Sequence, residues 1–210
     1  MRRPLTLYSL MNTGANALVP PVVVGLLLPA GFLAVHASGD AQAPAIFLSS
    51  CFGWLVPVLA SWWPLFVSKE RIEGDGRELL YFLKRRGESA TAVTLVVSYW
   101  ILLVPLVLLA VSKLGYAPLD VLILLARCLF LAVLAFWASF VFSSSPLALI
   151  VVLVFNLALM QPIERSVESL GPTLALGDAG GRSIAAMLIY VVAAAVMLVH
   201  GEARSRAFTD

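Results

Sequence analysis

The chain has 210 residues, of which 61% are hydrophobic and 12% charged, and its formal net charge is +2. Soluble domains are about 45–50% apolar and about 25% charged, so a soluble fold of this size could not bury so much apolar surface. The composition excludes a soluble enzyme, a nucleic-acid reader, a disordered regulator and a disulfide-stapled secreted domain. It predicts an all-α membrane protein that forms one transmembrane domain over residues 1–210.

Six stretches are long and apolar enough to cross a bilayer, because a hydrocarbon core of about 30 Å needs a helix of about 20 residues. The predicted spans are 16–36, 45–67, 90–112, 119–142, 145–161 and 183–200. The first is longer than the apolar region of a signal peptide, so we expect it to stay in the protein. The run 119–161 divides at Ser143–Pro146, where hydroxyls and a proline favour a new helix start. Prolines are expected to kink the second and third helices, at Pro57, Pro64 and Pro105.

The distribution of Lys and Arg predicts the orientation of these helices. Two basic residues lie before the first span, six in the loop 68–89 and two after the last span, against three on the opposite side. Cytoplasmic segments carry the excess of basic residues, so both termini and the loop 68–89 are predicted to be cytoplasmic. Trp62, Trp63 and Trp137 then lie near the inner interface and Tyr116 near the outer one. Frequent Ala and Arg with few Lys indicate a bacterium of high GC content, hence a bacterial plasma membrane.

Residue patterns typical of catalysis or metal binding do not occur in the sequence. There is no CxxC, HExxH or Cys/His cluster, and Cys51 and Cys128 lie in apolar runs. Asp120, at the start of the predicted span 119–142, is the one acidic residue within the predicted spans, whereas an intramembrane enzyme needs a nucleophile with a base, or carboxylates with a metal, at membrane depth. The chain also lacks the GxxxxGK[ST] loop that binds nucleotide phosphates. We therefore expect neither enzymatic activity nor a metal or cofactor in this chain.

The loop 68–89, SKERIEGDGRELLYFLKRRGES, contains six basic and five acidic residues. Its second half, 77–86, places apolar side chains between charged ends, which is typical of a short helix lying on a membrane surface. The segment is either a solvated positive-inside loop or a docking helix for a cytoplasmic partner, with Leu79, Tyr81 and Phe82 as anchors.

This loop, between the second and third of six spans, resembles the coupling element of the ABC-2 family of transporter permeases. In that family the stretch after the second span commonly has Glu, glycine, then Glu-Leu-Leu. The residues that match are Glu70, Glu73, Gly76, Glu78, Leu79 and Leu80. The sequence departs from the family where Lys84–Ser89 replaces a Pro-Val-Ser-Arg stretch, where the usual Thr after the glycine is missing, and in the short segment before the first span.

The resemblance implies the permease subunit of an ABC transporter, with a coupling helix seated in a groove of a separate ATP-binding subunit that holds ATP and Mg²⁺. It further implies export, a second six-helix permease subunit, identical or related, and an outer helical hairpin at 162–182. A partly disordered outer loop is the alternative for 162–182. Alternatives for the whole chain are an accessory polytopic membrane subunit, or a permease of another family such as the haem-exporter type.

Arg127 is the one charged residue well inside a predicted span, about 12 Å along its helix from Leu119. A charge at that depth is costly unless it pairs, snorkels or meets water. Either it contacts an anionic or polar substrate in the translocation path, or it snorkels to head groups or pairs with Asp120. Uncharged polar residues of the spans are expected to form hydrogen bonds between helices; they are Ser98, Ser139, Ser143 and Asn156. Asn156 is also a candidate for the path.

Overall fold

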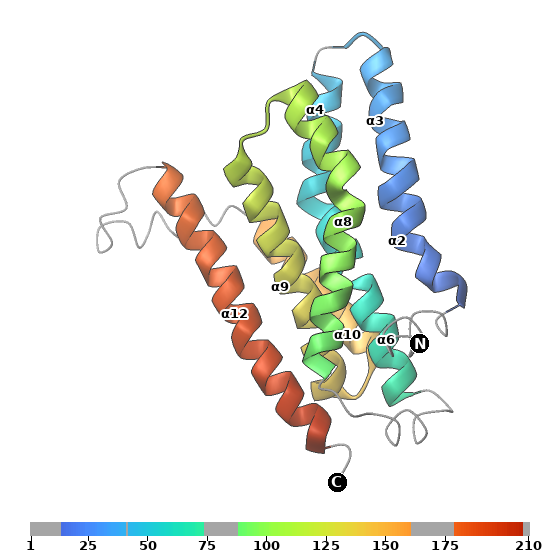
Figure 1. Cartoon of the computed structure of the whole chain (residues 1–210), viewed down its shortest axis with the longest axis vertical. Helices are drawn as coiled ribbons and strands as arrows, with labels where there is room; N and C mark the ends of the chain where they lie inside the picture. The colour runs from blue at the N-terminus through green and yellow to red at the C-terminus, as the bar shows by residue number, and fades with distance from the viewer. Residues whose placement is uncertain (1–13, 41, 74–87, 161–178, 208–210) are drawn as a thin grey trace, which may run out of the picture.

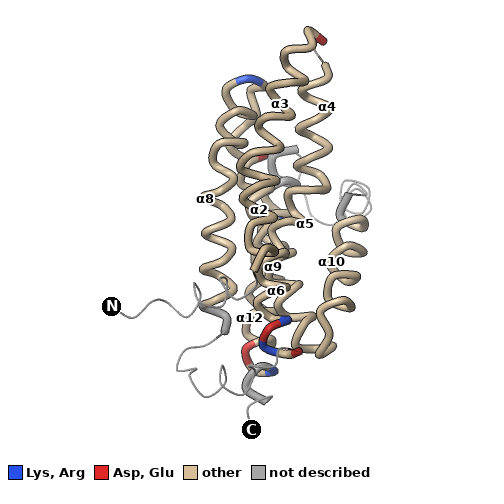
Figure 2. The backbone as a smooth tube through the Cα atoms, turned by 90° about the vertical axis from the view of Figure 1, so that its right-hand side faces the viewer, with Lys and Arg blue, Asp and Glu red and all other residues tan. Residues whose placement is uncertain are grey.

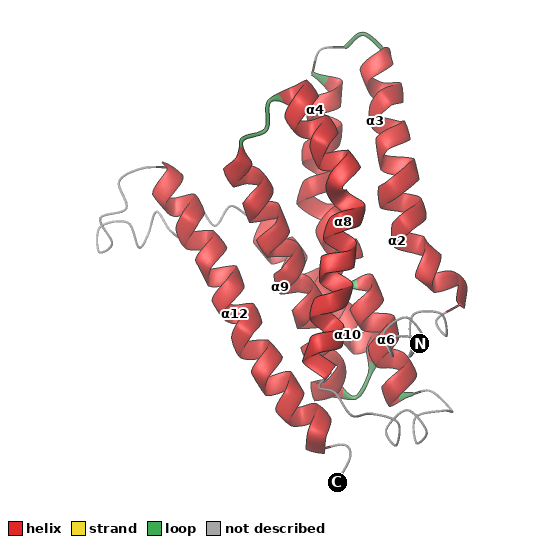
Figure 3. Cartoon of the chain, viewed as in Figure 1, coloured by secondary structure: helices red, strands yellow, loops and turns green. Residues whose placement is uncertain are grey.

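A computed structural model describes residues 14–40, 42–73, 88–160 and 179–207, and the helices of these ranges form an elongated bundle (Figure 1). All regular elements in these ranges are helical (Figure 3). In chain order they are η1 (Gly14–Leu18), α2 (Val19–Val22), η2 (Val23–Leu27), α3 (Leu28–Ala37), α4 (Ala43–Ser50), η3 (Cys51–Leu55), α5 (Val56–Ala60), α6 (Trp62–Ile72), α8 (Glu88–Leu114), α9 (Pro118–Phe142), α10 (Ser145–Met160) and α12 (Ala179–Ala207).

Within the described ranges, five continuous helical stretches are long and apolar enough to cross a membrane, so the chain is a multi-pass membrane protein. They are Gly14–Ala37, Ala43–Ile72, Thr91–Leu114, Pro118–Phe142 and Ile184–Arg204. These stretches confirm five of the predicted helices. The predicted span 145–161 corresponds to α10, which is apolar but has 16 residues, or about 24 Å of helix. Because α10 is shorter than a typical span, a sixth crossing stays a prediction.

The first two spans each contain a π-helical segment directly ahead of a proline. η2 precedes Pro29 and η3 precedes Pro57. Proline lacks an N–H, and its ring clashes with the carbonyl four residues earlier, which belongs to Gly25 in the first span and Gly53 in the second. The residue before each proline donates its N–H to the carbonyl five residues back instead of four. The predicted disturbance at Pro57 is thus a π segment.

The second span also changes direction at Ser61, between α5 and α6. The ring of Pro64 opposes a regular helix at the carbonyl of Ala60. The N–H of Ser61 bonds to the carbonyl of Val58 at 3.0 Å, and its hydroxyl donates to the same oxygen at 2.6 Å. Pro105, by contrast, lies inside α8, which continues through it as one helix.

The centre of the bundle is α9. In its most apolar stretch 61% of the residues are buried, against 17–33% in the other spans. It packs against α5, α6, α8, α10 and α12, while α10 and α12 have little contact with each other. Gly201 allows α12 to approach closely, because a Cβ at this position would lie 3.0 Å from the ring of Phe136 on α9. Every later element of the chain is thus positioned by α9.

Most charged residues of the described ranges lie towards the ends of the bundle, with a group where α6 and α12 end (Figure 2). The start of η1 lies at this same end (Figure 1). There the indole N–H groups of Trp62 and Trp63 donate to the carbonyls of Asn16 and Ala17, each at 3.0 Å. Tyr116, in the turn between α8 and α9, lies at the opposite end. The aromatic residues are therefore divided between the two ends, and which end is cytoplasmic stays a prediction.

Candidate functional site

The structure describes only the beginning of the predicted coupling segment. Glu70 is partly buried in α6, and Glu73 follows the last residue of that helix. The remaining predicted coupling residues lie outside the described ranges; they are Gly76, Glu78, Leu79, Leu80 and Phe82. Residues 162–178 of the predicted outer hairpin 162–182 lie outside them too, and residues from Ala179 onward belong to α12.

Glu73 connects the start of the coupling segment to α10. Its carboxylate Oε1 accepts the backbone N–H of Ser145, the first residue of α10, at 3.0 Å, across 72 positions of sequence. The first N–H groups of a helix have no partner within the helix, and negative charge is favourable there. The sequence predicted where α10 begins, and Ser143 ends α9 with a φ of 51°. The carboxylate that caps α10 was not predicted, because Glu73 lies far from α10 in the sequence, before the loop 74–87.

Inside the bundle, Arg127 of α9 bonds to Asn156 of α10. Its Nη2 lies 2.9 Å from the side-chain oxygen and 3.2 Å from the backbone oxygen of Asn156. Asn156 is fully buried, and its Nδ2 donates to the carbonyl of Trp54 at 3.2 Å. Trp54 belongs to η3, so one polar network joins α9, α10 and the π segment of the second span. We call Arg127, Asn156 and the Trp54 carbonyl the polar junction.

Pairing of Arg127 with Asp120, one of the predicted alternatives, is wrong. The carboxylate of Asp120 accepts the N–H of Ala117 at 3.2 Å and so satisfies a donor at the start of α9. The two residues lie about 10 Å apart along the helix. The structure gives Arg127 an interhelical partner that is neutral, Asn156.

Hydrogen bonding between helices was expected of four residues, and Asn156 confirms it. For two of the serines the expectation is wrong. Ser98 donates to the carbonyl of Thr94 at 2.9 Å and Ser139 to that of Ala135 at 2.8 Å, each within its own helix. A serine hydroxyl in a helix reaches the carbonyl four residues earlier without any help from a neighbour, whereas the longer amide of Asn156 reaches across.

Aromatic rings line the bundle one turn from Arg127. Phe130, three residues further along α9, contacts Phe155 of α10 with ring centroids 6.2 Å apart and Tyr190 of α12 at 5.6 Å. Tyr190 is only 5% exposed. Neither Tyr190 nor Trp54 was singled out from the sequence, because a tyrosine in an apolar helix and a backbone carbonyl carry no distinguishing pattern.

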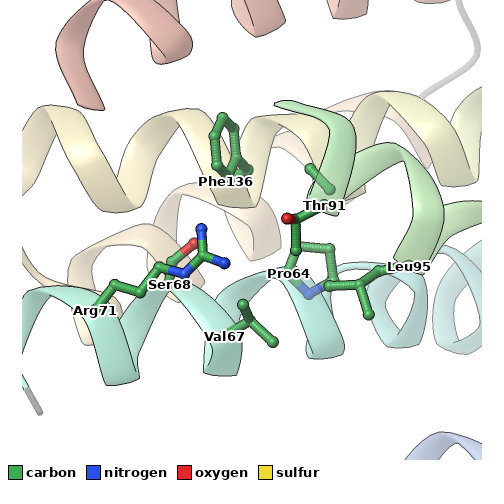
Figure 4. Close-up of a pocket in the computed structure, with 8 residues that line it drawn as sticks. Pro64, Val67, Ser68, Arg71, Thr91, Leu95 and Phe136 are labelled. Atoms are coloured by element: carbon green, nitrogen blue, oxygen red, sulfur yellow. The ribbon is translucent and has the colours of Figure 1, made fainter. Parts of the chain in front are cut away.

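A shallow cavity lies near the charged end, between α6, the start of α8 and α9 (Figure 4). Its lining includes Ser68, Arg71, Thr91 and Phe136, and its empty space of about 180 Å³ includes open solvent. It has room for about one water molecule. This cavity is too small for a transported molecule. Within the ranges that the structure covers, no group of three His, Cys, Asp or Glu is placed to hold a metal ion.

Comparisons of the sequence with protein-family models and curated proteins, and of the fold with solved structures, find no match in any of the three. The likeness to ABC-2 permeases therefore depends on the residues of the loop 68–89 and on the order of the apolar helices.

Proposed function

We propose that this chain is the permease subunit of an ABC-2 type transporter that exports a substrate across the bacterial plasma membrane. ATP hydrolysis takes place in a separate subunit, which binds ATP and Mg²⁺ and docks beneath the loop 68–89. The proposal is supported by the multi-pass helical bundle, by the charged loop between the second and third spans, and by the Glu, Gly, Glu-Leu-Leu pattern in that loop.

The observation that carries the proposal is the hydrogen bond from the Ser145 N–H to Glu73. A coupling element must transmit movement of a cytoplasmic subunit to helices within the membrane. Glu73 stands where α6 leads into the proposed docking segment, and its carboxylate holds the start of α10. Asn156 lies eleven residues further along α10, about 16 Å away, and holds Arg127 of α9. A displacement of the loop therefore has a direct route to the polar junction.

A second permease subunit, identical or related, completes the proposed transporter. Five spans and one shorter helix are few to enclose a path, and alternating access needs two halves that move against one another. One face of α8 is exposed and apolar over its length, and its residues are Val93, Val97, Ile101, Val104, Leu108 and Val111. Lipid or the second subunit would cover this face.

Purification from native membranes tests the proposal directly. The chain is isolated by affinity tag in mild detergent with trapped nucleotide, and proteins that accompany it are identified by mass spectrometry. We expect an ATP-binding protein at about one copy per permease, and a second membrane protein if the permease is a heterodimer. Recovery of the chain alone would contradict the proposal and favour an accessory membrane subunit.

Variants in the loop then test the coupling role. Leu79→Asp with Leu80→Asp, or Glu78→Lys, should abolish substrate-stimulated ATPase activity in the reconstituted complex and leave membrane insertion unchanged. Glu73→Lys is a poorer test, because this residue also caps α10. Lys113→Glu, a charge reversal at the exposed far end of α8, is the matched control and should retain activity. Normal transport by the Leu79/Leu80 variant would remove the coupling helix from the mechanism.

A further inference from the structure

Arg127 has more hydrogen-bond donors than the protein satisfies. A guanidinium carries five N–H bonds, and within the described ranges only those on Nη2 meet an acceptor, Asn156. The Nε atom is buried and has no partner. Nη1 makes no hydrogen bond to any residue that the structure describes. Among the described residues, the cation is therefore held in place through one nitrogen, and its other donors have no acceptor there.

The hydroxyl of Tyr190 is a second hydrogen-bond donor, besides those of Arg127, that has no acceptor among the described residues. The Tyr190 side chain is almost completely buried, and its ring lies 5.6 Å from the ring of Phe130, one turn along α9 from Arg127. The hydroxyl makes no hydrogen bond within the described ranges. By contrast, the hydroxyl of Tyr99, equally buried in α8, donates to the carbonyl of Val56 at 2.6 Å.

A positive charge at this depth needs a negative partner. Arg127 lies nine residues into α9, about 13 Å along the helix, where a charge without compensation is costly. The described ranges place no carboxylate against it. An anion that accepts from Nη1 and the Tyr190 hydroxyl would supply the missing charge and satisfy both groups.

The surroundings of these donors favour an anion that carries an apolar tail. Phe130, one turn along α9 from Arg127, lies between the rings of Phe155 and Tyr190. Phe155 is 42% exposed on the surface of α10. On α12, Leu188 and Ile189 beside Tyr190 are also more than half exposed. Because α10 and α12 pack on α9 rather than on each other, the donors lie next to membrane-facing apolar surface.

We propose that Arg127 and Tyr190 form a binding site for the anionic head group, phosphate or carboxylate, of a membrane amphiphile whose apolar part lies along the exposed ring of Phe155. Asn156 is a positioning residue that fixes the guanidinium. The inference that this is a substrate site rests on the proposed transport function, but binding of the amphiphile is measurable without the ATP-binding subunit. A failure of the binding proposal is therefore distinguishable from a failure of the transport proposal.

Native mass spectrometry of the purified full chain in neutral detergent measures the binding. The probes are a phosphatidylglycerol, oleate, the uncharged lipid monoolein and inorganic phosphate. Tyr190→Phe removes only the hydroxyl, and Arg127→Gln removes the charge. Tyr99→Phe and Lys113→Gln are the matched controls, since they make the same kinds of change at sites that the proposal does not use. A folded elution profile is required of each variant, and Tyr190→Phe tests the site if Arg127→Gln does not fold.

The two anionic amphiphiles should bind the wild-type chain and both controls in preference to monoolein. Arg127→Gln should weaken them by about tenfold or more, as expected for hydrogen bonds to a charged group, and Tyr190→Phe severalfold. Equal binding by wild type and both site variants would overturn the proposal. If inorganic phosphate binds as tightly as phosphatidylglycerol, the ligand is not an amphiphile and that part of the proposal is wrong. If Glu164→Gln with Glu168→Gln raises the affinity for phosphatidylglycerol about tenfold, a carboxylate of this chain pairs with Arg127, and the proposal of an external anion is wrong.

Discussion

Replacement of Asn156 by leucine removes the polar groups that connect three parts of the bundle and keeps the branching and the number of non-hydrogen atoms of the side chain. Two hydrogen bonds are lost, from Arg127 to the amide oxygen at 2.9 Å and from the amide nitrogen to the Trp54 carbonyl at 3.2 Å. The guanidinium then retains only the backbone oxygen of residue 156. Because Asn156 is fully buried, water cannot replace the lost partners.

The size of the effect follows from these two bonds. A hydrogen bond to a charged group contributes about 1.5–3 kcal/mol and a neutral one about 0.5–1.5 kcal/mol. Hydrogen bonds between membrane helices average only about 0.6 kcal/mol, which gives a lower bound near 1 kcal/mol for the pair. We expect Asn156→Leu to lower the free energy of unfolding by about 1–4 kcal/mol. Arg127→Met in the same chain should recover part of the loss, since no unpaired cation then remains.

Equilibrium unfolding in mixed micelles, followed with a thiol-reactive fluorophore, measures these free energies. Cys51 and Cys128 are free and buried, so labelling reports loss of the fold. Ser139→Ala is the control, because its hydroxyl bonds only within α9, and it should change stability by less than about 0.5 kcal/mol. Additive effects of Arg127→Met and Asn156→Leu, within about 0.3–0.5 kcal/mol, would refute the reasoning that the two side chains act together.

Three further perturbations test other contacts. Gly201→Leu should destabilise the packing of α12 on α9 by about 1–3 kcal/mol, with Gly201→Ala causing less, as measured by the same unfolding assay; equal stability of both variants and wild type would contradict the close approach. Glu73→Gln should cost about 0.5–2 kcal/mol by weakening the cap of α10, and a neutral result would show that water caps the helix equally well. Burial, and secondarily the carboxylate of Asp120, raises the pKa of Tyr116, so the neutral phenol is favoured by the fold. Stability from this group is complete below the ordinary tyrosine pKa of about 10 and declines as pH rises through the raised value. Ultraviolet difference titration against Tyr116→Phe should show a midpoint that Asp120→Asn lowers, and an unchanged midpoint would exclude the contribution of the carboxylate.

Long apolar stretches were predictable because hydropathy over about 20 residues is a property of sequence alone. The break between α9 and α10 was predictable for a similar reason, since Ser143–Pro146 combines helix-capping hydroxyls with a proline. The partner that caps α10 was not, because Glu73 lies 72 positions away and its role depends on how α6 and α10 pack. Arg127 was recognisable from the sequence as a charge inside a span. That the amide of Asn156 on α10 lies closer to it than Asp120 depends on how α9 and α10 pack, which the sequence does not show.

The π segments, too, were predictable only in part. Prolines in the spans predicted disturbed helices, and η3 and the turn at Ser61 lie at two of the predicted sites. The sequence did not indicate that a helix could accommodate Pro57 by shifting one hydrogen bond by a residue. It also did not indicate that the carbonyl of Trp54, within the shifted stretch, would accept the amide of Asn156. Such a contact depends on which neighbouring helix presents a donor at that height.

The burial of α9 has a consequence for the biogenesis of the protein. A polytopic chain is synthesised from its N-terminus, so the segments up to α8 leave the ribosome before the helix on which α5, α6 and α8 pack. Their inward surfaces, including Leu106 and Val56, which become fully buried, must face lipid or the insertion machinery until α9 arrives. Once α9 is in place, α10 and α12 can dock on its remaining sides in the order in which they are made. Truncation before residue 118 should therefore leave spans that insert but remain accessible to quality-control proteases, whereas truncation after residue 142 should leave a protected core.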